Sequence, residues 1–352
     1  SLGSMPLLFF IAILLITNQF FISLYTNNIW FGKFKSYDGM QRAHIGEVPR
    51  LGGFAIYLSL LGFYFFYEGD KFSNGQEFLI LISPFIIISV VEDIFHNVSI
   101  KLRLLVMTVV VLSLTIFWID SFPAVKHIPI LSNLLEFKAF SVLFFTLAFI
   151  VLMNGANFID GMNGLAGLFF LGAFLSCFSL SYIANDNQAF IELIPWLVAL
   201  LIFLLFNFPL GKIFLGDSGA YLLAVFLGGW LINFFATHNQ FSSWNAAFIL
   251  IYPTIEALFS VTRKAIKGNS PFHPDRNHLH IRIFDTIKRS TKNSTYANNA
   301  TTLFLAIFWI TPPLVLPYVY NSQVSIIFSI IIFSLVYVLL YLWISSIKHK
   351  NS

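Results

Sequence analysis

The feature that most limits what this chain can fold into is a series of long apolar stretches with almost no charge. Hydrophobic residues make up 58% of the 352 positions and charged residues only 10%, whereas an ordinary soluble domain has about 25% charged residues. The apolar runs are roughly 17–22 residues long, enough for a helix to cross a hydrocarbon core of ~30 Å. The sequence therefore predicts an all-α polytopic membrane protein.

The apolar runs give about eleven expected transmembrane helices within a single integral membrane domain, residues 5–352. The spans are expected at about 6–26, 51–67, 77–95, 102–119, 139–153, 164–183, 191–208, 219–236, 244–262, 301–320 and 324–345. Residues 1–4 (SLGS), which precede Met5, resemble a cloning scar and are left out of the domain.

The distribution of Lys and Arg orients these spans. With the N-terminus outside, the odd-numbered connections and the C-terminus lie inside, and only Lys71, Lys126 and Lys138 of the 20 basic residues fall outside. The opposite orientation would place most basic residues on the outer face, against the positive-inside rule. We therefore expect an outer N-terminus and a cytoplasmic C-terminus, and the net charge of +4 reflects topology rather than nucleic-acid binding.

The five cytoplasmic connections contain the residues that are suited to chemistry. They are expected at 27–50, 92–103, 154–163, 209–218 and 263–300, and in or next to them lie the stretches RAHIGEVPRLGG, VEDIFHNVSIKLR, NGANFIDGMNGLAG, NFPLGKIFLGDSGAYL and SPFHPDRNHLHIR. The outer connections have few carboxylates and no comparable groups of Gly, Asn, Asp and His. A binding or catalytic site is therefore expected on the cytoplasmic face.

Four carboxylates converge on this face from three of the connections. Glu92 and Asp93 are adjacent at the inner end of a span, and Asp160 and Asp217 each lie next to a glycine at a helix boundary. Hard oxygen ligands of this kind suit Mg²⁺ or Mn²⁺, which share their remaining coordination with water and substrate phosphates. The alternative is that each acid only caps a helix end.

Basic side chains near these acids are suited to phosphate groups. Lys101 and Arg103 follow the acidic pair by roughly two helical turns, and His278 and His280 lie in a segment rich in Arg and His. Phosphate is bound by charge-assisted donors, and Arg can bind it bidentately. For Lys101 and Arg103 the alternative is the positive-inside rule alone. A zinc site at the two histidines is the other option, but no cysteine or close third ligand supports it.

Polar residues in the third connection and in one later span are also unusual. The Gly and Asn residues of NGANFIDGMNG allow tight backbone turns, and Asn154, Asn157 and Asn163 are candidates for hydrogen bonds with a base or a sugar; a simple helix break is the alternative. Glu256 lies within a span, where an ionisable residue is costly and usually functional or paired. Together with Pro253 it indicates a broken helix near the site.

The order of these motifs resembles that of a known enzyme family. ED, NGANFIDGMNGLAG, FLGDSGAYLLA and PDRNHLH, within residues 42–282, are similar to motifs of the polyprenyl-phosphate N-acetylhexosamine-1-phosphate transferase superfamily, glycosyltransferase family 4. The resemblance implies a helical bundle in the bacterial inner membrane with a Mg²⁺-dependent cytoplasmic site. It also implies transfer of an N-acetylated amino-sugar 1-phosphate from a UDP-sugar to undecaprenyl phosphate, with release of UMP. In the family this is the first membrane step of a cell-surface polysaccharide such as O-antigen.

Individual residues match the family motifs with a few departures. The matched positions are the aspartate pair at Glu92 and Asp93, the first Asp of DGxDG at Asp160, the metal-binding Asp at Asp217 and the C-terminal His motif at His278 and His280. Glu92 stands where the family commonly has Asp, Asn163 replaces the second Asp of DGxDG, and Ile281 replaces the last His. These departures resemble the branch that starts O-antigen-type polymers, and they leave the donor sugar open.

The resemblance also suggests roles for these residues. Phosphoryl transfer requires positioning and charge neutralisation, so we expect Asp217, with help from Glu92, to hold Mg²⁺ against the donor diphosphate. Asp93 is expected to deprotonate or orient the attacking lipid phosphate. The predicted substrate-binding residues are Asp160, Asn154, Asn157, Asn163, Lys101, Arg103, Arg50, Arg276, His278 and His280. The oligomeric state stays open, with a homodimer as one option.

Two other classes of protein remain as alternatives. An intramembrane aspartyl protease also has a Gly-Asp motif, but Phe214 occupies the first position of what would be GxGD. A non-enzymatic lipid or solute transporter would have several polar residues in mid-membrane, and only Glu256 clearly qualifies. Release of UMP that depends on a lipid phosphate would distinguish the transferase from both.

Overall fold

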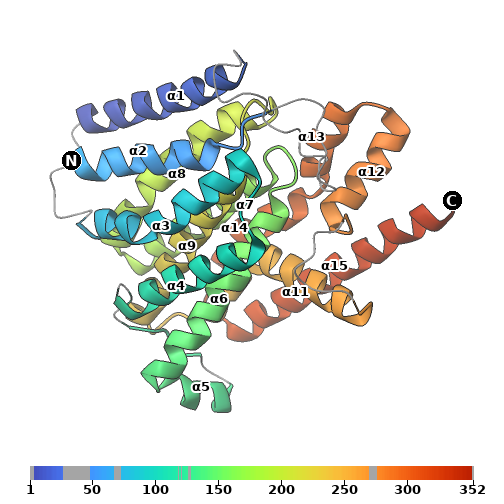
Figure 1. Ribbon diagram of the computed structural model, residues 1–352. Coiled ribbons are helices and arrows are strands. Elements are labelled where there is room, and N and C mark those ends of the chain that lie inside the picture. The colour runs from blue at the N-terminus through green and yellow to red at the C-terminus, as the bar shows by residue number, and fades with distance from the viewer. Residues whose placement is uncertain are drawn as a thin grey trace.

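The computed structural model describes residues 4–26, 48–66, 73–117, 119, 121–125, 128–268 and 276–350. Over these residues the chain is helical and contains no β-strand (Figure 1). The helices are α1 (Ser4–Thr26), α2 (Gly52–Phe66), α3 (Ser73–Phe95), α4 (Ile100–Phe117), α5 (Pro129–Leu135), α6 (Lys138–Ile159), α7 (Leu165–Ala184), α8 (Asn187–Asn207), α9 (Gly216–Thr237), α10 (Trp244–Ile249), α11 (Ile251–Ile266), α12 (Leu279–Thr291), α13 (Ser294–Phe304), α14 (Ala306–Val319) and α15 (Gln323–Lys350). Most of the predicted connection 27–50, and 269–275 of the fifth connection, lie outside the described residues.

In the described part of the chain, eight helices are long and apolar enough to cross a membrane. They are Gly75–Phe95, Ile100–Phe117, Lys138–Ile159, Leu165–Ala184, Asn187–Asn207, Gly216–Thr237, Ser294–Val319 and Gln323–Ile347. Two shorter apolar helices, Phe9–Leu24 and Gly52–Phe66, coincide with the first two predicted spans. The chain is a multi-pass helical membrane protein, as its composition predicts.

Two predicted spans are interrupted helices. The span expected at 244–262 consists of α10 and α11, which are separated at Leu250. Pro253 lies in the first turn of α11, where its missing N–H costs little because the first N–H groups of a helix have no partner in the helix. The span expected at 301–320 begins inside α13 and continues as α14 after a break at Leu305. The helix break predicted from Pro253 and Glu256 is therefore present.

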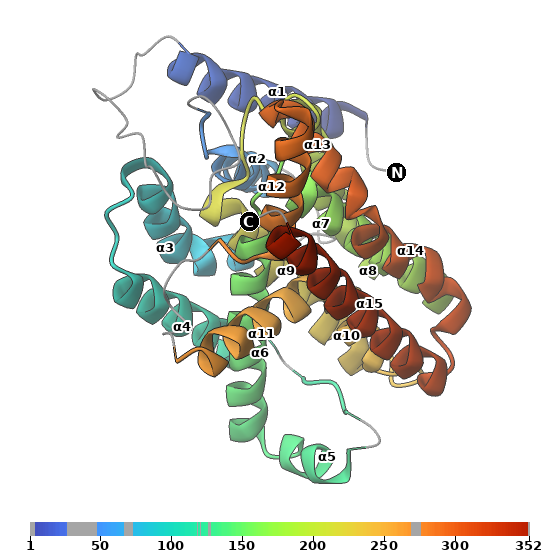
Figure 2. The ribbon, with the colours of Figure 1, turned by 90° about the vertical axis from the view of Figure 1, so that its right-hand side faces the viewer.

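Helix α9 forms the centre of the bundle (Figure 1). Of its 22 residues, 19 are buried, and it packs against α2, α3, α6 and α7. Its backbone meets that of α2 where Gly53 faces Gly219, and a Cβ on Gly53 would collide with the Gly219 backbone. Helices α1 and α5 lie at opposite edges of the bundle in both views (Figures 1 and 2).

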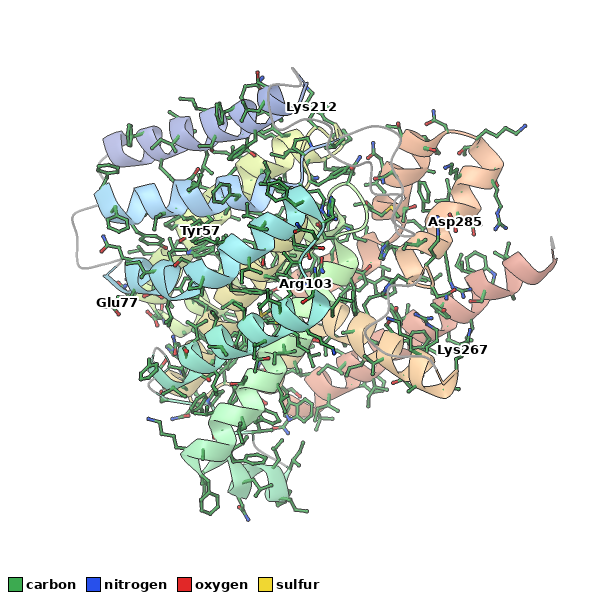
Figure 3. All side chains as sticks on the ribbon, in the orientation of Figure 1. Tyr57, Glu77, Arg103, Lys212, Lys267 and Asp285 are labelled. Atoms are coloured by element: carbon green, nitrogen blue, oxygen red, sulfur yellow. The ribbon has the colours of Figure 1, made fainter. Side chains whose placement is uncertain are left out.

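The described parts of the predicted cytoplasmic connections lie towards one end of the bundle. Glu77, near the start of α3, and Arg103, in the first turn of α4, lie at opposite ends of this helix pair (Figure 3). Lys212, Lys267 and Asp285 lie towards the same end as Arg103 (Figure 3). Helix α12, which sequence periodicity did not reveal within the fifth connection, lies at this end.

Candidate active site

The N-terminus of α9 is the centre of the predicted site. Gly216 begins the helix with a φ of +75°, a left-handed conformation that favours glycine. A Cβ at this position would also lie 2.7 Å from Asp93 Oδ2. Asp217 follows in the first turn and is only 5% exposed, in a place where the helix dipole favours a negative charge. The glycine before Asp217 is therefore required by the backbone turn and by the close approach of Asp93.

Asp93, in the last turn of α3, caps α9 from outside the helix. Its two carboxylate oxygens accept hydrogen bonds from the backbone N–H groups of Asp217 (2.9 Å) and Ser218 (3.0 Å). The first N–H groups of a helix have no partner within the helix, so this external carboxylate satisfies them. Asp93 thereby fixes Asp217 relative to α3.

Two arginines bind the Asp217 carboxylate. Arg50 Nη2 donates to Oδ1 at 2.8 Å, and Arg103 Nη1 donates to Oδ2 at 2.6 Å. Arg50 Nε also lies 3.3 Å from Asp93 Oδ1, and Arg103 Nη1 lies 3.8 Å from Glu92 Oε1. Burial lowers the pKa of the Arg50 guanidinium, but the neighbouring carboxylates raise it further, so Arg50 stays charged.

The backbone next to Arg50 is hydrogen-bonded to the segment that leads into α9. The Phe214 N–H donates to the Pro49 carbonyl at 2.8 Å. In return, the Gly52 N–H donates to the Phe214 carbonyl at 2.9 Å and the Gly53 N–H to the Leu215 carbonyl at 2.8 Å. The ends of the first and fourth connections are thus paired, which places Arg50 against Asp217.

The end of α6 forms the third side of the site. Asp160 Oδ2 accepts a hydrogen bond from the Gly216 N–H at 3.1 Å, and Asn157 Nδ2 donates to the Tyr221 hydroxyl at 3.0 Å. Burial raises the pKa of Asp160 well above its usual range, and the Arg50 charge opposes this rise. Asp160 and Asn157 therefore join the end of α6 to the first turns of α9.

These contacts join four carboxylates and two guanidinium groups into one network. We call it the acid cluster: Glu92, Asp93, Asp160 and Asp217 with Arg50 and Arg103. With every group ionised, four negative and two positive charges leave a formal charge of −2. Residues from four predicted connections form this cluster.

A second buried polar group lies where α11, α12 and α15 meet. His278 Nδ1 lies 2.8 Å from Glu256 Oε1, and the Tyr337 hydroxyl donates to Glu256 Oε2 at 2.6 Å. The rings of His278 and His280 are nearly parallel, with centroids 5.7 Å apart. We call Glu256, His278, His280 and Tyr337 the histidine cluster. The intramembrane glutamate noted in the sequence is thus paired with the first histidine of the HLH motif.

The turn after α6 contacts both clusters. The Phe158 ring packs against the His278 ring, with centroids 4.9 Å apart. Asp160 belongs to the acid cluster, and the next residue, Gly161, lies so close to His280 Nε2 that a Cβ would collide with the imidazole. The two clusters are therefore neighbours across a single turn of chain.

Two of the predicted asparagines make other contacts. Asn154 donates to the Ile150 carbonyl of its own helix at 2.7 Å. The Asn163 backbone N–H donates to Asn298 Oδ1 at 2.8 Å, and its side chain donates to Asn299 Oδ1 at 3.0 Å. Asn163 thus joins the turn after α6 to α13.

Two predicted basic residues lie at the surface. The Lys101 side chain is exposed. Arg276 is exposed as well, and its Nη2 lies 3.4 Å from Asp285 Oδ1 in α12. Neither makes a described contact with the acid cluster, in contrast to Arg50 and Arg103.

A family model described as glycosyl transferase family 4 matches residues 76–235, which contain all four carboxylates of the acid cluster. An undecaprenyl-phosphate alpha-N-acetylglucosaminyl 1-phosphate transferase of Thermotoga maritima is 27% identical over 242 residues, covering 68% of this chain and 69% of its own length. The chain is thus similar to glycosyl transferase family 4 over the part that contains these carboxylates.

Further relatives of this chain have similar names. A decaprenyl-phosphate N-acetylglucosaminephosphotransferase of Mycobacterium leprae is 25% identical over 280 residues, which is 70% of this chain and 69% of the relative. A probable undecaprenyl-phosphate N-acetylglucosaminyl 1-phosphate transferase of Bacillus subtilis is 25% identical over 249 residues, 69% of this chain and 67% of the relative. The family 4 match ends before the histidine cluster begins.

The donor set of the acid cluster fits a magnesium ion by its chemistry. Among the described residues, no three His, Cys, Asp or Glu side chains are grouped so that they would hold a metal. Mg²⁺ commonly takes only one or two carboxylates and completes its shell with water and substrate phosphates. The acid cluster offers carboxylate oxygens and a formal charge that matches a divalent cation.

Sequence reasoning missed several residues of the two clusters. Tyr221 lies four residues after Asp217 on the same helix, and this spacing is a signal that was available. Tyr337 lies in an apolar run 81 residues from its partner Glu256, where nothing local marks it. The sequence also does not predict the asparagines of α13 that bind Asn163, because nothing local shows that α13 packs against the turn after α6.

Proposed function

We propose that this protein transfers an N-acetylated amino-sugar 1-phosphate from a UDP-sugar to undecaprenyl phosphate, which yields undecaprenyl-diphosphate-sugar and UMP. The relatives are named as transferases that act on undecaprenyl or decaprenyl phosphate with an N-acetylglucosamine unit. The reaction would be the first membrane step of a cell-surface polysaccharide such as O-antigen.

The observation that carries this proposal is the double arginine contact on Asp217. Arg50 and Arg103 approach the two oxygens of one carboxylate at 2.8 and 2.6 Å. Their guanidinium groups are donors of the kind that bind phosphate oxygens bidentately, which supports the proposal. In the proposed reaction they exchange part of this contact for the phosphates of the donor.

We propose that Asp217 and Glu92 hold Mg²⁺ when substrate binds. The bound ion would neutralise charge on the donor diphosphate as the phosphoryl group is transferred. Glu92 Oε2 accepts a hydrogen bond from the Val98 N–H at 2.9 Å, while its Oε1 has only the 3.8 Å contact with Arg103. Glu92 Oε1 thus accepts no hydrogen bond from a described residue and is open to a cation.

Asp93 could either orient the lipid phosphate or hold other residues of the acid cluster in place. The family resemblance suggests that it orients the attacking lipid phosphate. Its oxygens are engaged by the Asp217 and Ser218 N–H groups and by Arg50. We therefore propose that Asp93 acts mainly by holding Asp217 and Arg50 in place, while a phosphate dianion needs little help to attack.

We propose a bacterial inner-membrane location with eleven spans, an outer N-terminus and the acid cluster on the cytoplasmic face. The positive-inside distribution of Lys and Arg supports this orientation. A UDP-sugar donor is consistent with it, because nucleotide sugars are cytoplasmic metabolites.

The test is to assay the purified, detergent-solubilised protein with Mg²⁺, undecaprenyl phosphate and one UDP-sugar at a time. The donors are UDP-GlcNAc, UDP-GalNAc, UDP-QuiNAc and UDP-FucNAc, and the readouts are released UMP and the mass of the lipid product. We expect UMP release that depends on the lipid phosphate, with one donor preferred. UMP release from none of the four donors would overturn the proposal and favour a transporter or a protease.

A further inference from the structure

A cavity of about 290 Å³ lies in the described part of the chain, away from the acid cluster. Its walls come from residues 144–152 of α6, residues 228–235 of α9, residues 243–250 around α10, and the segment that connects α4 with α6, including Leu131 of α5. Phe149 in its wall precedes Asp160 by eleven residues along α6, which is about 16 Å at 1.5 Å per residue. The cavity therefore lies towards the end of α6 and α9 that is opposite to the acid cluster.

The side chains that line this cavity are almost entirely apolar. The polar groups among them are the Ser243 hydroxyl and the Trp244 indole N–H, and the hydroxyl already donates to the Ala124 carbonyl at 2.9 Å. A water molecule in such a cavity finds too few polar partners to be held. A hydrocarbon chain, in contrast, gains dispersion contacts with every wall. The lining therefore suits the chain of a lipid.

The cavity can be reached from the lipid-facing surface of the bundle. Ala148 of α6, Ala247 of α10 and Ile128 line it and are also exposed at the protein surface. The alanine side chains are small, so they leave space between the two helices at this point. Because α6 is long and apolar enough to span the membrane, its exposed residues face lipid. A lipid chain can thus enter from the side, without passing through the acid cluster.

Trp244 indicates which kind of lipid fits. Its Nε1–H is a donor only, and it is buried without a hydrogen-bond partner among the described residues. A buried donor without an acceptor destabilises the protein. Trp244 begins α10, at the edge of the predicted span 244–262, which is the depth at which Trp side chains of membrane proteins gather. The acceptors that glycerophospholipids offer at this depth are ester carbonyls, whereas a polyprenyl tail has no polar atom.

We propose that this cavity binds one acyl chain of a glycerophospholipid, from the leaflet opposite to the acid cluster, and that the ester carbonyl of this chain accepts a hydrogen bond from Trp244 Nε1–H. This lipid site is separate from the transferase reaction and does not depend on it. Leu250, at which α10 and α11 separate, is part of the cavity wall. The bound chain therefore packs against the joint between these helices and stabilises it.

The first test compares lipids on the delipidated, detergent-solubilised protein by native mass spectrometry. The probes are dipalmitoyl phosphatidylglycerol, its diether analogue without ester carbonyls, and undecaprenyl phosphate. A single hydrogen bond changes affinity by about two- to tenfold. We expect the wild type to bind the ester lipid more tightly than the diether by this factor, and Trp244→Phe to bind both equally. Trp343→Phe, which changes an exposed Trp of α15, is the matched control and should keep the preference for the ester.

Equal binding of the ester and diether lipids by the wild type would overturn the proposal, even if Trp244→Phe fails to fold. The same holds if undecaprenyl phosphate displaces the phospholipid from the wild type but not from Ala148→Phe, because the cavity would then hold the polyprenyl tail.

The second test blocks the cavity at its opening. Ala148→Phe and Ala247→Phe enlarge exposed side chains of the wall, so the bundle is expected to fold while affinity for the ester lipid falls by at least about tenfold. Leu147→Phe is the matched control, since Leu147 is exposed next to Ala148 but does not line the cavity. The ester lipid should raise the unfolding temperature of the wild type and of Leu147→Phe, and not that of the two blocked variants. Equal lipid stabilisation of all four proteins would place the lipid elsewhere and refute the proposal.

Discussion

The acid cluster and the histidine cluster both bury carboxylates, but they satisfy them differently. In the acid cluster, four carboxylates share two arginines and three backbone N–H groups at the start of α9, so negative charge remains in excess. In the histidine cluster, one carboxylate has a side-chain donor on each oxygen. The acid cluster keeps an excess negative charge that a bound cation can neutralise. In the histidine cluster, hydrogen-bond donors of the protein already satisfy both oxygens of the carboxylate. This difference separates a region suited to bind ligands from one suited to orient a side chain.

The largest effect on activity is expected when the negative charge of Asp217 is removed from the acid cluster. Asp217→Asn deletes the charge that both arginines contact, and we expect kcat to fall by about 10²–10³-fold. The measurement is UMP release at saturating Mg²⁺. Glu77→Gln, at the opposite end of the bundle, is the control and should retain full activity (Figure 3). Near-normal turnover of Asp217→Asn would remove the metal role of Asp217.

The next largest effect is expected at Asp93, because it caps α9 from another helix. Asp93→Asn exchanges one acceptor oxygen for an NH₂ group that faces a backbone N–H, and leaving such a donor unsatisfied costs about 1–3 kcal/mol. We expect a lower unfolding temperature in detergent and a loss of activity of roughly tenfold or more. Asp186 provides the control, since it caps α8 with bonds to the Gln188 and Ala189 N–H groups. Activity losses of equal size in Asp186→Asn and Asp93→Asn would show that Asp93 matters only for stability.

A smaller effect is expected where the two clusters touch. Gly161→Ala places a methyl group against His280 Nε2, so the imidazole must move. We expect kcat to fall by about tenfold, since small displacements of positioning groups slow catalysis. Gly62→Ala in α2 is the matched control, because a Cβ there meets nothing within 4 Å. If both variants turn over like the wild type, the second histidine has no part in arranging the site.

The smallest effect on activity is expected at Asn163, whose hydrogen bonds run to α13. Asn163→Ala removes the side-chain bond to Asn299, and we expect a stability loss of about 1 kcal/mol with kcat and KM nearly unchanged. Thermal unfolding and substrate titration measure the two effects separately. A large rise in KM for the UDP-sugar would instead support the substrate contact that the sequence suggested.

Much of the fold follows from apolar run length, but the interrupted helices do not. Hydropathy alone predicts long spans such as α7 and α9. At α6 it predicts only residues 139–153, whereas the helix continues through Asn154 and Asn157 to Ile159. The helix breaks at Leu250 and Leu305 lie within apolar sequence, so hydropathy does not predict them. Only Pro253 and the polar Glu256 indicate the break at Leu250. Hydropathy does not predict helix α12, because its basic, amphipathic sequence has the composition of a cytoplasmic loop.

The site shows the same division between local and distant signals. Glu92, Asp93, Asp160 and Asp217 stand out because carboxylates are rare in this chain and these four are predicted on one face. Which partner each acid would find was not predictable, since Arg50 and Asp217 are 167 residues apart and meet only through tertiary packing. The pairing of Glu256 with His278 is of the same kind, because it requires the residue that precedes α12 to reach α11.

The contact between Gly53 and Gly219 has a mechanical consequence. Backbones this close leave no space for one helix to slide along the other, and the bonds from Gly52 and Gly53 to the segment before α9 lock the joint further. We therefore expect α2 and α9 to move as one body, together with Arg50 and Asp217. We expect rearrangements during a reaction cycle to occur instead at the interrupted helices, between α10 and α11 and between α13 and α14.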